Sequence, residues 1–312
     1  MSFSTPWKTG TGFFHAVEKQ GPIFPRNVKT FGDFSTERRN FGRFFHTVEN
    51  FFPHCGKIRA AIPRAGGAGF SLVELLVTMA AIGLLAAILV PALPAAKAAA
   101  DAAACRSNLR QLAAANLAYA ADHGRYVAAA SDIDGPNSIR WHGVRDGKAF
   151  DGAKGPLAPY LGGGGGSAWV RRCPGFRPDA AGFETSCGGY GYNQVGVGSE
   201  LCLPHGGGNA VGLRVGALAH PAATVMFADA AYLQGNGTKA KLIEYSFVEP
   251  PQFAGGGTPP WPTIHFRHRG RANVAWADGH VTSETRARAG SRGAAQDLGW
   301  FGPDDNSLFD PY

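Results

Sequence analysis

The chain has 312 residues and a formal net charge of +7, from 30 Lys and Arg against 23 Asp and Glu. Ten of the basic and four of the acidic residues precede residue 70, so the rest of the chain, with 20 basic and 19 acidic residues, is nearly neutral. A nucleic-acid-binding body would need a basic face, and this balance excludes nucleic acid as its partner. The 44 glycines favour a fold rich in loops.

Residues 1–69 do not have the pattern of a folded domain. The segment Phe13–Glu18 recurs in altered form at Phe44–Glu49, and two copies are too few to bury the core of a repeat protein. Neither helical nor strand periodicity is sustained between the copies. We interpret residues 1–69 as a basic, disordered leader that is removed. The alternative is a cytoplasmic extension with a binding role of its own.

Residues 70–94 form an apolar stretch in which Glu74 is the only charged residue. As a helix, this stretch can cross the roughly 30 Å hydrocarbon core of a bilayer with its backbone groups satisfied internally. Lys57, Arg59 and Arg64 lie just before it, so the positive-inside rule predicts a single span with a cytoplasmic N-terminus and an exported body. A carboxylate inside such a span costs about 2.5–3.5 kcal/mol, so Glu74 is expected to have a partner.

Residues 95–123 are rich in alanine and predict an exposed continuation of the same helix. Leu109, Leu112 and Asn116 recur at helical spacing, and Gly124 follows as a natural stop. The pattern predicts one helix over residues 70–122, about 80 Å long at 1.5 Å per residue. Gly83 and the two prolines, Pro91 and Pro94, are its expected weak or kinked points.

Residues 124–312 predict a globular body of short strands joined by long Gly- and Pro-rich loops. The strands are expected over residues 222–228, 242–248, 264–267, 272–277 and 280–283. Asp278-Gly279 predicts a type I′ hairpin before the last of them. The expected fold class is therefore α+β, with an antiparallel β-rich body packed on the exposed half of the long helix.

Four cysteines lie on the exported side, namely Cys105, Cys173, Cys187 and Cys202. Their even number permits disulfides in an oxidising compartment. The alternative is that they are buried thiols that behave as small hydrophobic side chains. The sequence leaves both interpretations open.

The start of the apolar stretch resembles the cleavage and methylation motif of type IV prepilins and type II secretion pseudopilins. The matching residues are Gly69, Phe70 and Ser71-Leu-Val-Glu74, and Gly83 and Pro91 are similar to the family's helix-loosening positions. The resemblance implies that a prepilin peptidase cuts between Gly69 and Phe70 and methylates the new amine. It also implies an inner-membrane protein whose Glu74 pairs with that amine on a neighbouring subunit. An ordinary secretory signal cut near residues 96–100 is the alternative, and it leaves Glu74 unexplained.

A second resemblance lies in the body. His268, nine residues and then Asp278-Gly279 look like the His-x9-Asp-Gly region of prepilin-type proteins with large globular bodies. Several smaller motifs agree with that group in their order along the chain: Cys105-Arg-Ser-Asn-Leu-Arg-Gln-Leu, Cys173-Pro174, Tyr190-Gly-Tyr-Asn193 and the strand ending at Asp229.

His265, His268, Asp278 and His280 also suggest chemistry because they are close together in sequence. We interpret His268, Asp278 and Gly279 as a structural pin, in which the histidine donates to the Asp of an Asp-Gly turn. A zinc site on these histidines and a calcium site using Asp229 and Asp278 are the alternatives.

From these motifs we expect a non-enzymatic, prepilin-like subunit of a type II secretion-like pseudopilus or a type IV pilus-like filament, with its body in the periplasm or outside the cell. Its expected partners are the prepilin peptidase, copies of itself or other pseudopilins, and inner-membrane lipid. No catalytic residue, cofactor or metal is expected. The alternatives are a monomeric membrane-anchored binding protein and an anchored metallohydrolase using His268, Asp278 and His280.

Overall fold

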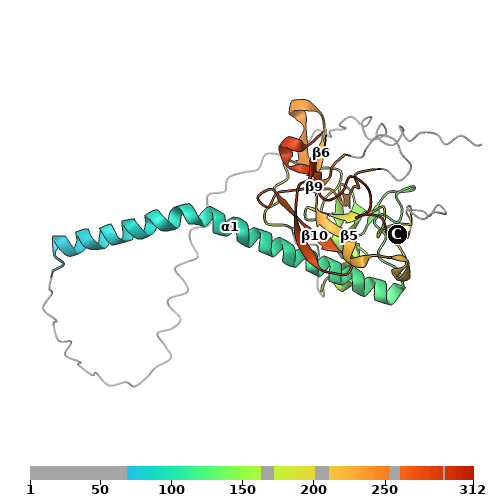
Figure 1. Ribbon diagram of the computed structural model, residues 1–312, viewed down its shortest axis with the longest axis horizontal. Helices are drawn as coiled ribbons and strands as arrows, with labels where there is room; N and C mark the ends of the chain where they lie inside the picture. The colour runs from blue at the N-terminus through green and yellow to red at the C-terminus, as the bar shows by residue number, and fades with distance from the viewer. Residues whose placement is uncertain (1–68, 163–171, 201–210, 253–260, 291) are drawn as a thin grey trace, which may run out of the picture. The chain divides into compact units, whose positions relative to one another are not determined.

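The computed structural model describes residues 69–162, 172–200, 211–252, 261–290 and 292–312. Residues Phe70–Tyr312 belong to one compact unit. Its described residues form one long α-helix and thirteen short strands grouped in four sheets (Figure 1). This arrangement confirms the α+β prediction. The interpretation of residues 1–68 as a leader lies outside the described residues.

The helix α1 runs from Leu72 to His123, within two residues of the sequence prediction at its start and one at its end. Ser71 caps it, because its hydroxyl accepts a hydrogen bond from the Glu74 amide at 3.2 Å. The Glu74 carboxylate reaches back to the Ser71 amide at 2.9 Å, which completes a capping box. Gly124 ends the helix in the left-handed region at φ 68°, and its N–H bonds to the Ala120 carbonyl at 2.8 Å.

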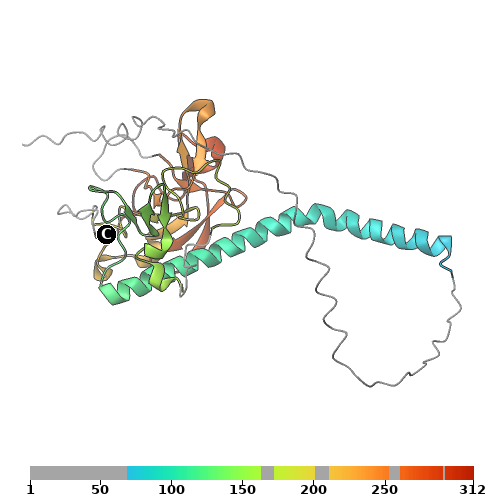
Figure 2. The ribbon, with the colours of Figure 1, turned by 180° about the vertical axis from the view of Figure 1, so that it is seen from behind.

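The two halves of α1 differ in their surroundings. The apolar side chains from Phe70 to Leu93 are exposed, and this part is long and apolar enough to cross a membrane. Buried positions on the helix begin at Cys105 and continue at helical spacing: Leu109, Leu112, Ala113, Ala115, Asn116 and Ala120. Pro91 and Pro94 lie inside the helix, which continues through both but changes direction near its middle in both views (Figures 1 and 2).

The largest sheet has five strands in the order β11-β10-β5-β4-β8. The strands are β4 (Tyr190–Asn193), β5 (Val225–Asp229), β8 (Phe247–Val248), β10 (Arg271–Trp276) and β11 (Val281–Thr285). The pairs β11–β10, β10–β5 and β5–β4 are antiparallel, whereas β4 and β8 are parallel. Strands β10, β5 and β11 pack against the buried half of α1. The sheet is therefore mixed, whereas the sequence predicted antiparallel strands.

Three smaller sheets complete the described body. One contains β1 (Ile139–Arg140), β2 (Gly143–Asp146) and β3 (Ala149–Asp151), and another pairs β6 (Tyr232–Gln234) with β7 (Lys241–Ile243). The third has the order β12-β13-β9, with β9 at Ile264–His265, β12 at Arg288–Ala289 and β13 at Leu298–Trp300. Six short 3-10 helices lie in the described connections: Gly152–Lys154, Ala158–Tyr160, Val215–Ala217, Pro221–Ala223, Gly237–Lys239 and Ala294–Gln296.

Two predicted strands differ from the structure for local reasons. Pro221–Ala223 forms a 3-10 turn, so β5 begins only at Val225. The stretch 242–248 is split between β7 and β8, which belong to different sheets. Between them, Glu244 and Ser246 are buried and bind groups on other segments, so the chain leaves one sheet before it enters the next.

The hairpin between β10 and β11 is not the predicted type I′ turn. A type I′ turn needs positive φ at both central residues, whereas here Gly279 has φ 94° and Asp278 is not among the residues with positive φ. The Gly279 amide bonds to the Trp276 carbonyl, and the Trp276 amide bonds to the His280 carbonyl, both at 2.9 Å. Three residues therefore close this hairpin, with the glycine in the left-handed position.

Candidate functional site

The first candidate site is the N-terminal end of α1. Gly69, Phe70 and Ser71 precede the helix, and Phe70 is 83% exposed. The bond between Gly69 and Phe70 therefore lies outside regular secondary structure, in the short segment that leads into the capping box. Glu74 lies one helical turn beyond this bond, with its carboxylate directed back to the Ser71 amide. A carboxylate accepts more than one hydrogen bond, so this contact leaves capacity for a second donor.

The second candidate site is a buried cluster of four side chains from distant parts of the chain. Cys105 lies on α1, Cys173 precedes a turn at Pro174, Asp229 ends β5, and His268 lies in the turn before β10. Each offers one sulfur, oxygen or nitrogen atom, and these four atoms lie within 4.8 Å of one another. All four residues are buried. We call this set the Cys-Cys-Asp-His cluster.

Hydrogen bonds connect the members of the cluster. The Cys105 thiol donates to Asp229 Oδ1 at 3.0 Å, and Cys173 Sγ lies 3.4 Å from His268 Nε2. The same His268 nitrogen is 3.4 Å from Asp229 Oδ2. The backbone amide of Asn273 donates to Asp229 Oδ2 at 2.7 Å, so β10 fixes the orientation of the carboxylate.

A buried arginine balances the charge of Asp229. Arg267 Nη2 lies 3.1 Å from Asp229 Oδ1 and also donates to the carbonyls of Gly189 and Ala230. Its guanidinium stacks over the Phe176 ring at 4.5 Å. Burial would raise the pKa of Asp229, but the arginine charge and the contact with His268 outweigh burial and hold that pKa at about 2. Asp229 is therefore ionised at neutral pH.

Contacts within the cluster also shift the pKa values of the two thiols and of the imidazole. The neighbouring side chain of Cys105 lowers the pKa of Cys173 to about 5, and the contact with His268 adds to this effect. Burial acts to lower the pKa of His268, but the hydrogen bonds to Asp229 and Cys173 raise it to about 9. Burial raises the pKa of Cys105 above its usual range. The cluster therefore favours an anionic sulfur at Cys173.

The Tyr190-Gly-Tyr-Asn193 motif attaches the sheet to α1 beside this cluster. Tyr190 and Tyr192 alternate along β4, and their hydroxyls accept hydrogen bonds from Asn108 and Asn116 of the helix, each at 3.0 Å. The side-chain oxygen of Asn116, Oδ1, accepts a hydrogen bond from the Val127 amide at 2.9 Å, so this asparagine joins the helix, the strand and the segment that follows the helix. Two tyrosines that are two residues apart on β4 thus bind two asparagines that are eight residues apart on α1.

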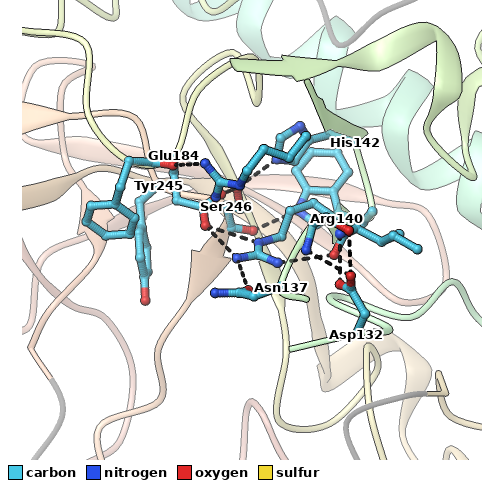
Figure 3. Close-up of polar contacts among 12 residues, drawn as sticks. Asp132, Asn137, Arg140, His142, Glu184, Tyr245 and Ser246 are labelled. Atoms are coloured by element: carbon cyan, nitrogen blue, oxygen red, sulfur yellow. Dashed lines mark hydrogen bonds and ion pairs between the residues drawn. The ribbon is translucent and has the colours of Figure 1, made fainter. Parts of the chain in front are cut away.

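A third polar centre lies at β1 and has the features of a structural anchor (Figure 3). Arg140 donates to Glu184 Oε1 through Nε at 3.0 Å and Nη2 at 2.9 Å, and both side chains are at most 3% exposed. Ser246 donates to the other oxygen of Glu184 and contacts His142 Nε2 at 2.7 Å. Asn137 Oδ1 accepts from Arg140 Nη2 at 2.7 Å. Because each charge has a direct partner, this network joins three segments without exposing a reactive group.

The structure separates the histidines and acids that are close in sequence. His268 and Asp278 lie at opposite ends of β10, so the predicted pin between them is wrong; His268 contacts Asp229 instead. Asp278 instead accepts the His280 amide at 3.0 Å and contacts the His280 ring, so it caps the turn between β10 and β11. Among the described residues, the one group of side chains placed to share an ion contains His268 and Asp229 but not His265, Asp278 or His280. The structure therefore does not bring together the donors of the predicted zinc site or of the predicted calcium site.

Of the two interpretations of the cysteines, the structure agrees with buried thiols for the three that it describes. Cys105, Cys173 and Cys187 are buried free thiols in the structure, and Cys202 lies outside the described residues. Cys187 belongs to a different environment from the cluster, because its amide donates to Glu244 Oε2 at 3.1 Å and its thiol lies 3.7 Å from the same oxygen.

Sequence reasoning did not identify the Cys-Cys-Asp-His cluster or Arg267. Each of its members stood in a motif that was noted separately, and the order of these motifs along the chain was the only available signal. Cys105 and Asp229 are 124 residues apart, and Cys173 and His268 are 95 residues apart, so their meeting depends on the sheet topology.

No protein-family model, curated protein or solved structure matches the chain. Its function is therefore inferred from its own residues and their geometry.

Proposed function

We propose that the chain is a prepilin-like structural subunit, cut after Gly69, N-methylated at Phe70 and assembled through α1 into a type II secretion-like pseudopilus or a type IV pilus-like filament. The observation that carries the proposal is the sequence of features at the N-terminal end of α1. A glycine-aromatic junction precedes a capping box that contains Glu74, and an exposed apolar helix of membrane-spanning length follows. In this proposal the basic side faces the cytoplasm and the body is exported across the inner membrane.

The capping box supports a specific role for Glu74. Before cleavage its carboxylate satisfies the Ser71 amide of its own chain. Cleavage at Gly69 creates an α-amine at Phe70, close to the same carboxylate in sequence. In a filament, the amine of one subunit and the carboxylate of the next are opposite charges in an apolar environment, where such a pair is strongly favoured over two unpaired charges. Assembly thus pairs a charge that would otherwise be costly in lipid.

The mature N-terminus tests the processing step. Mass spectrometry of the protein from membranes is expected to find N-methylated Phe70 as the first residue. A mature chain that starts near residue 97, or one that retains residues 1–69, would contradict the proposal.

Substitutions at Glu74 test assembly separately from capping. Glu74→Gln keeps a side chain that completes a capping box but removes the charge. Glu74→Ala removes both, and Ser71→Ala removes only the hydroxyl cap, at a cost of about 0.5–2 kcal/mol in helix stability. We expect Glu74→Gln and Glu74→Ala to be processed but to lose cross-linking between neighbouring subunits in membranes, and Ser71→Ala to keep it.

The same three variants distinguish the filament from a lone membrane anchor. If Glu74→Gln cross-links like the wild type while Glu74→Ala does not, Glu74 serves only as a cap. If none of the variants changes the cross-linking pattern, a monomeric anchored binding protein is the better account.

A further inference from the structure

We propose that the Cys-Cys-Asp-His cluster is a structural zinc site that ties helix α1 to the body. The donors are Cys105 Sγ, Cys173 Sγ, one Asp229 oxygen and His268 Nε2, whose atoms lie within 4.8 Å of one another. Thiolate, imidazole and carboxylate are the three ligand types that zinc takes from proteins, and four ligands are typical of its structural sites. This proposal replaces the expectation of a metal-free body and does not depend on filament assembly.

The distances between the donors fit one shared ion. With metal–ligand bonds of about 2.0–2.3 Å, the edges of a tetrahedron around zinc are about 3.3–3.8 Å long. The separations from His268 Nε2 to Cys173 Sγ and to Asp229 Oδ2 are both 3.4 Å. Cys105 Sγ lies 3.0 Å from the other carboxylate oxygen, Asp229 Oδ1. No two of the four donor atoms are more than 4.8 Å apart, so the donors need to move by about 1 Å to close around one ion.

The geometry does not suit a nucleophilic cysteine activated by a histidine. In such an arrangement the imidazole uses one nitrogen toward the nucleophile and the other toward the orienting acid. Here one nitrogen, Nε2 of His268, faces both Cys173 and Asp229. Cys105, Cys173 and Asp229 are fully buried. Two hollows on the described surface, one beside Arg172 and Glu244 and one beside Tyr119 and His123, include no cluster residue. A closed site of convergent donors is the pattern of a structural metal centre.

The charges of the cluster also balance around a divalent ion. Two thiolates and the Asp229 carboxylate carry three negative charges, and zinc with the Arg267 guanidinium carries three positive charges. Zinc therefore replaces two protons in the buried cluster without changing its net charge. Arg267 contacts Asp229, and two further nitrogens of its guanidinium, Nε and Nη1, have no acceptor among the described residues. These are charge-assisted donors suited to a buried anionic cluster.

The surrounding contacts hold the ligands in place, as outer contacts do in metal sites. Asn273 fixes Asp229 through its backbone amide, and Arg267 binds the second carboxylate oxygen. Cys105 is on α1, whereas the other three donors lie on the body. A bound ion would thus add covalent-like bonds across the interface between the helix and the sheet.

Cobalt titration of the purified full chain in detergent tests the site. After treatment with a chelator, the wild type is expected to bind one Co²⁺ per chain with a thiolate-to-cobalt charge-transfer band and the intense visible bands of a tetrahedral ion. Zinc is expected to displace the cobalt and bleach the spectrum. Absence of a stoichiometric, zinc-displaceable spectrum in the folded wild type would overturn the proposal.

Substitutions of the proposed ligands, with a control outside the cluster, test whether the metal binds at these residues. Cys105→Ser and His268→Ala are expected to weaken cobalt binding by at least the roughly 10–100-fold that the loss of an outer contact costs. Cys187→Ser is the control, because Cys187 is an equally buried thiol that contacts Glu244 instead of the cluster. Equal losses in the control and in Cys105→Ser would contradict the assignment. A Cys105–Cys173 disulfide, detected by mass spectrometry of the protein isolated from membranes without reductant, would also overturn it.

Discussion

At the scale of single residues, His142 shows how burial fixes a charge state. Its Nε2 contacts Ser246, and its Nδ1 is buried without a hydrogen-bond partner among the described residues. Burial, with the nearby Arg140 and Arg145, lowers the pKa of His142 to about 3. A proton on this ring would therefore add a buried positive charge close to those of Arg140 and Arg145.

This shift predicts a loss of stability in acid. Between about pH 3 and 6.5 the unfolded chain binds a proton at His142 that the folded chain does not, so the free energy of unfolding falls as the pH falls. The slope from one such group is about 1.4 kcal/mol per pH unit. We expect His142→Gln, which keeps a donor near Ser246, to reduce this slope by about one proton between pH 4 and 6.

Urea unfolding of the full chain in detergent, followed by tryptophan fluorescence at several pH values, measures the slope. If the variant and the wild type lose stability with the same slope, His142 is not protonated on unfolding in this range, and the account of its burial is wrong. His265, whose pKa burial and Arg267 lower to about 3, should contribute a second proton of the same sign in both proteins.

At the same scale, the local role of a residue could be predicted from the sequence better than its contacts with residues far away in the chain. The Asp278-Gly279 turn follows from local chemistry, because the aspartate binds an amide two residues ahead and the glycine takes positive φ. His268 was assigned to the wrong acid, since closeness in sequence favoured Asp278. Its actual partner, Asp229, reaches it through the pairing of β5 with β10, which no local pattern encodes.

At the scale of elements, the buried stripe of α1 should dominate the stability of the body. Leu109 is fully buried in the core that includes Tyr192 and Phe227. Leu109→Ala is expected to lower the free energy of unfolding of the body by about 2–5 kcal/mol. Leu84→Ala, in the exposed apolar half, is the matched control and should leave urea unfolding of the body unchanged. Equal effects of the two substitutions would contradict the division of the helix into two halves.

The elements also show where prediction from sequence succeeds. The bounds of α1 were predicted within two residues because alanine-rich composition, helical spacing and a terminal glycine all indicate the same structure. The stretch 242–248 was predicted as one strand from its composition, but buried contacts of Glu244 with Arg172 and Cys187 divide it. Tertiary contacts of this kind override the intrinsic preference of a short segment for a continuous β-strand.

At the scale of the whole molecule, the apolar half of α1 and the core of the body share no buried side chain among the described residues. The first buried side chain described on α1 is Cys105, so residues 70–94 add nothing to the core of the body. A chain that begins at Ala95 is therefore expected to be soluble without detergent and to unfold at the same urea concentration as the body of the full chain. Gel filtration and fluorescence-detected unfolding measure these properties. Aggregation or a lower midpoint would show that the apolar half stabilises the body.

The prolines inside α1 have a mechanical consequence. Pro91 and Pro94 lack the N–H groups that would bond to the carbonyls of Ala87 and Val90, so bending stiffness is lowest there. This joint lies about 30 Å from Leu72 along the helix. A rotation of about 10° at the joint swings the tip by about 5 Å, roughly one helical pitch. The apolar half of α1 can thus change its direction relative to the body by bending at the prolines, while the packing around Cys105 and Leu109 stays fixed.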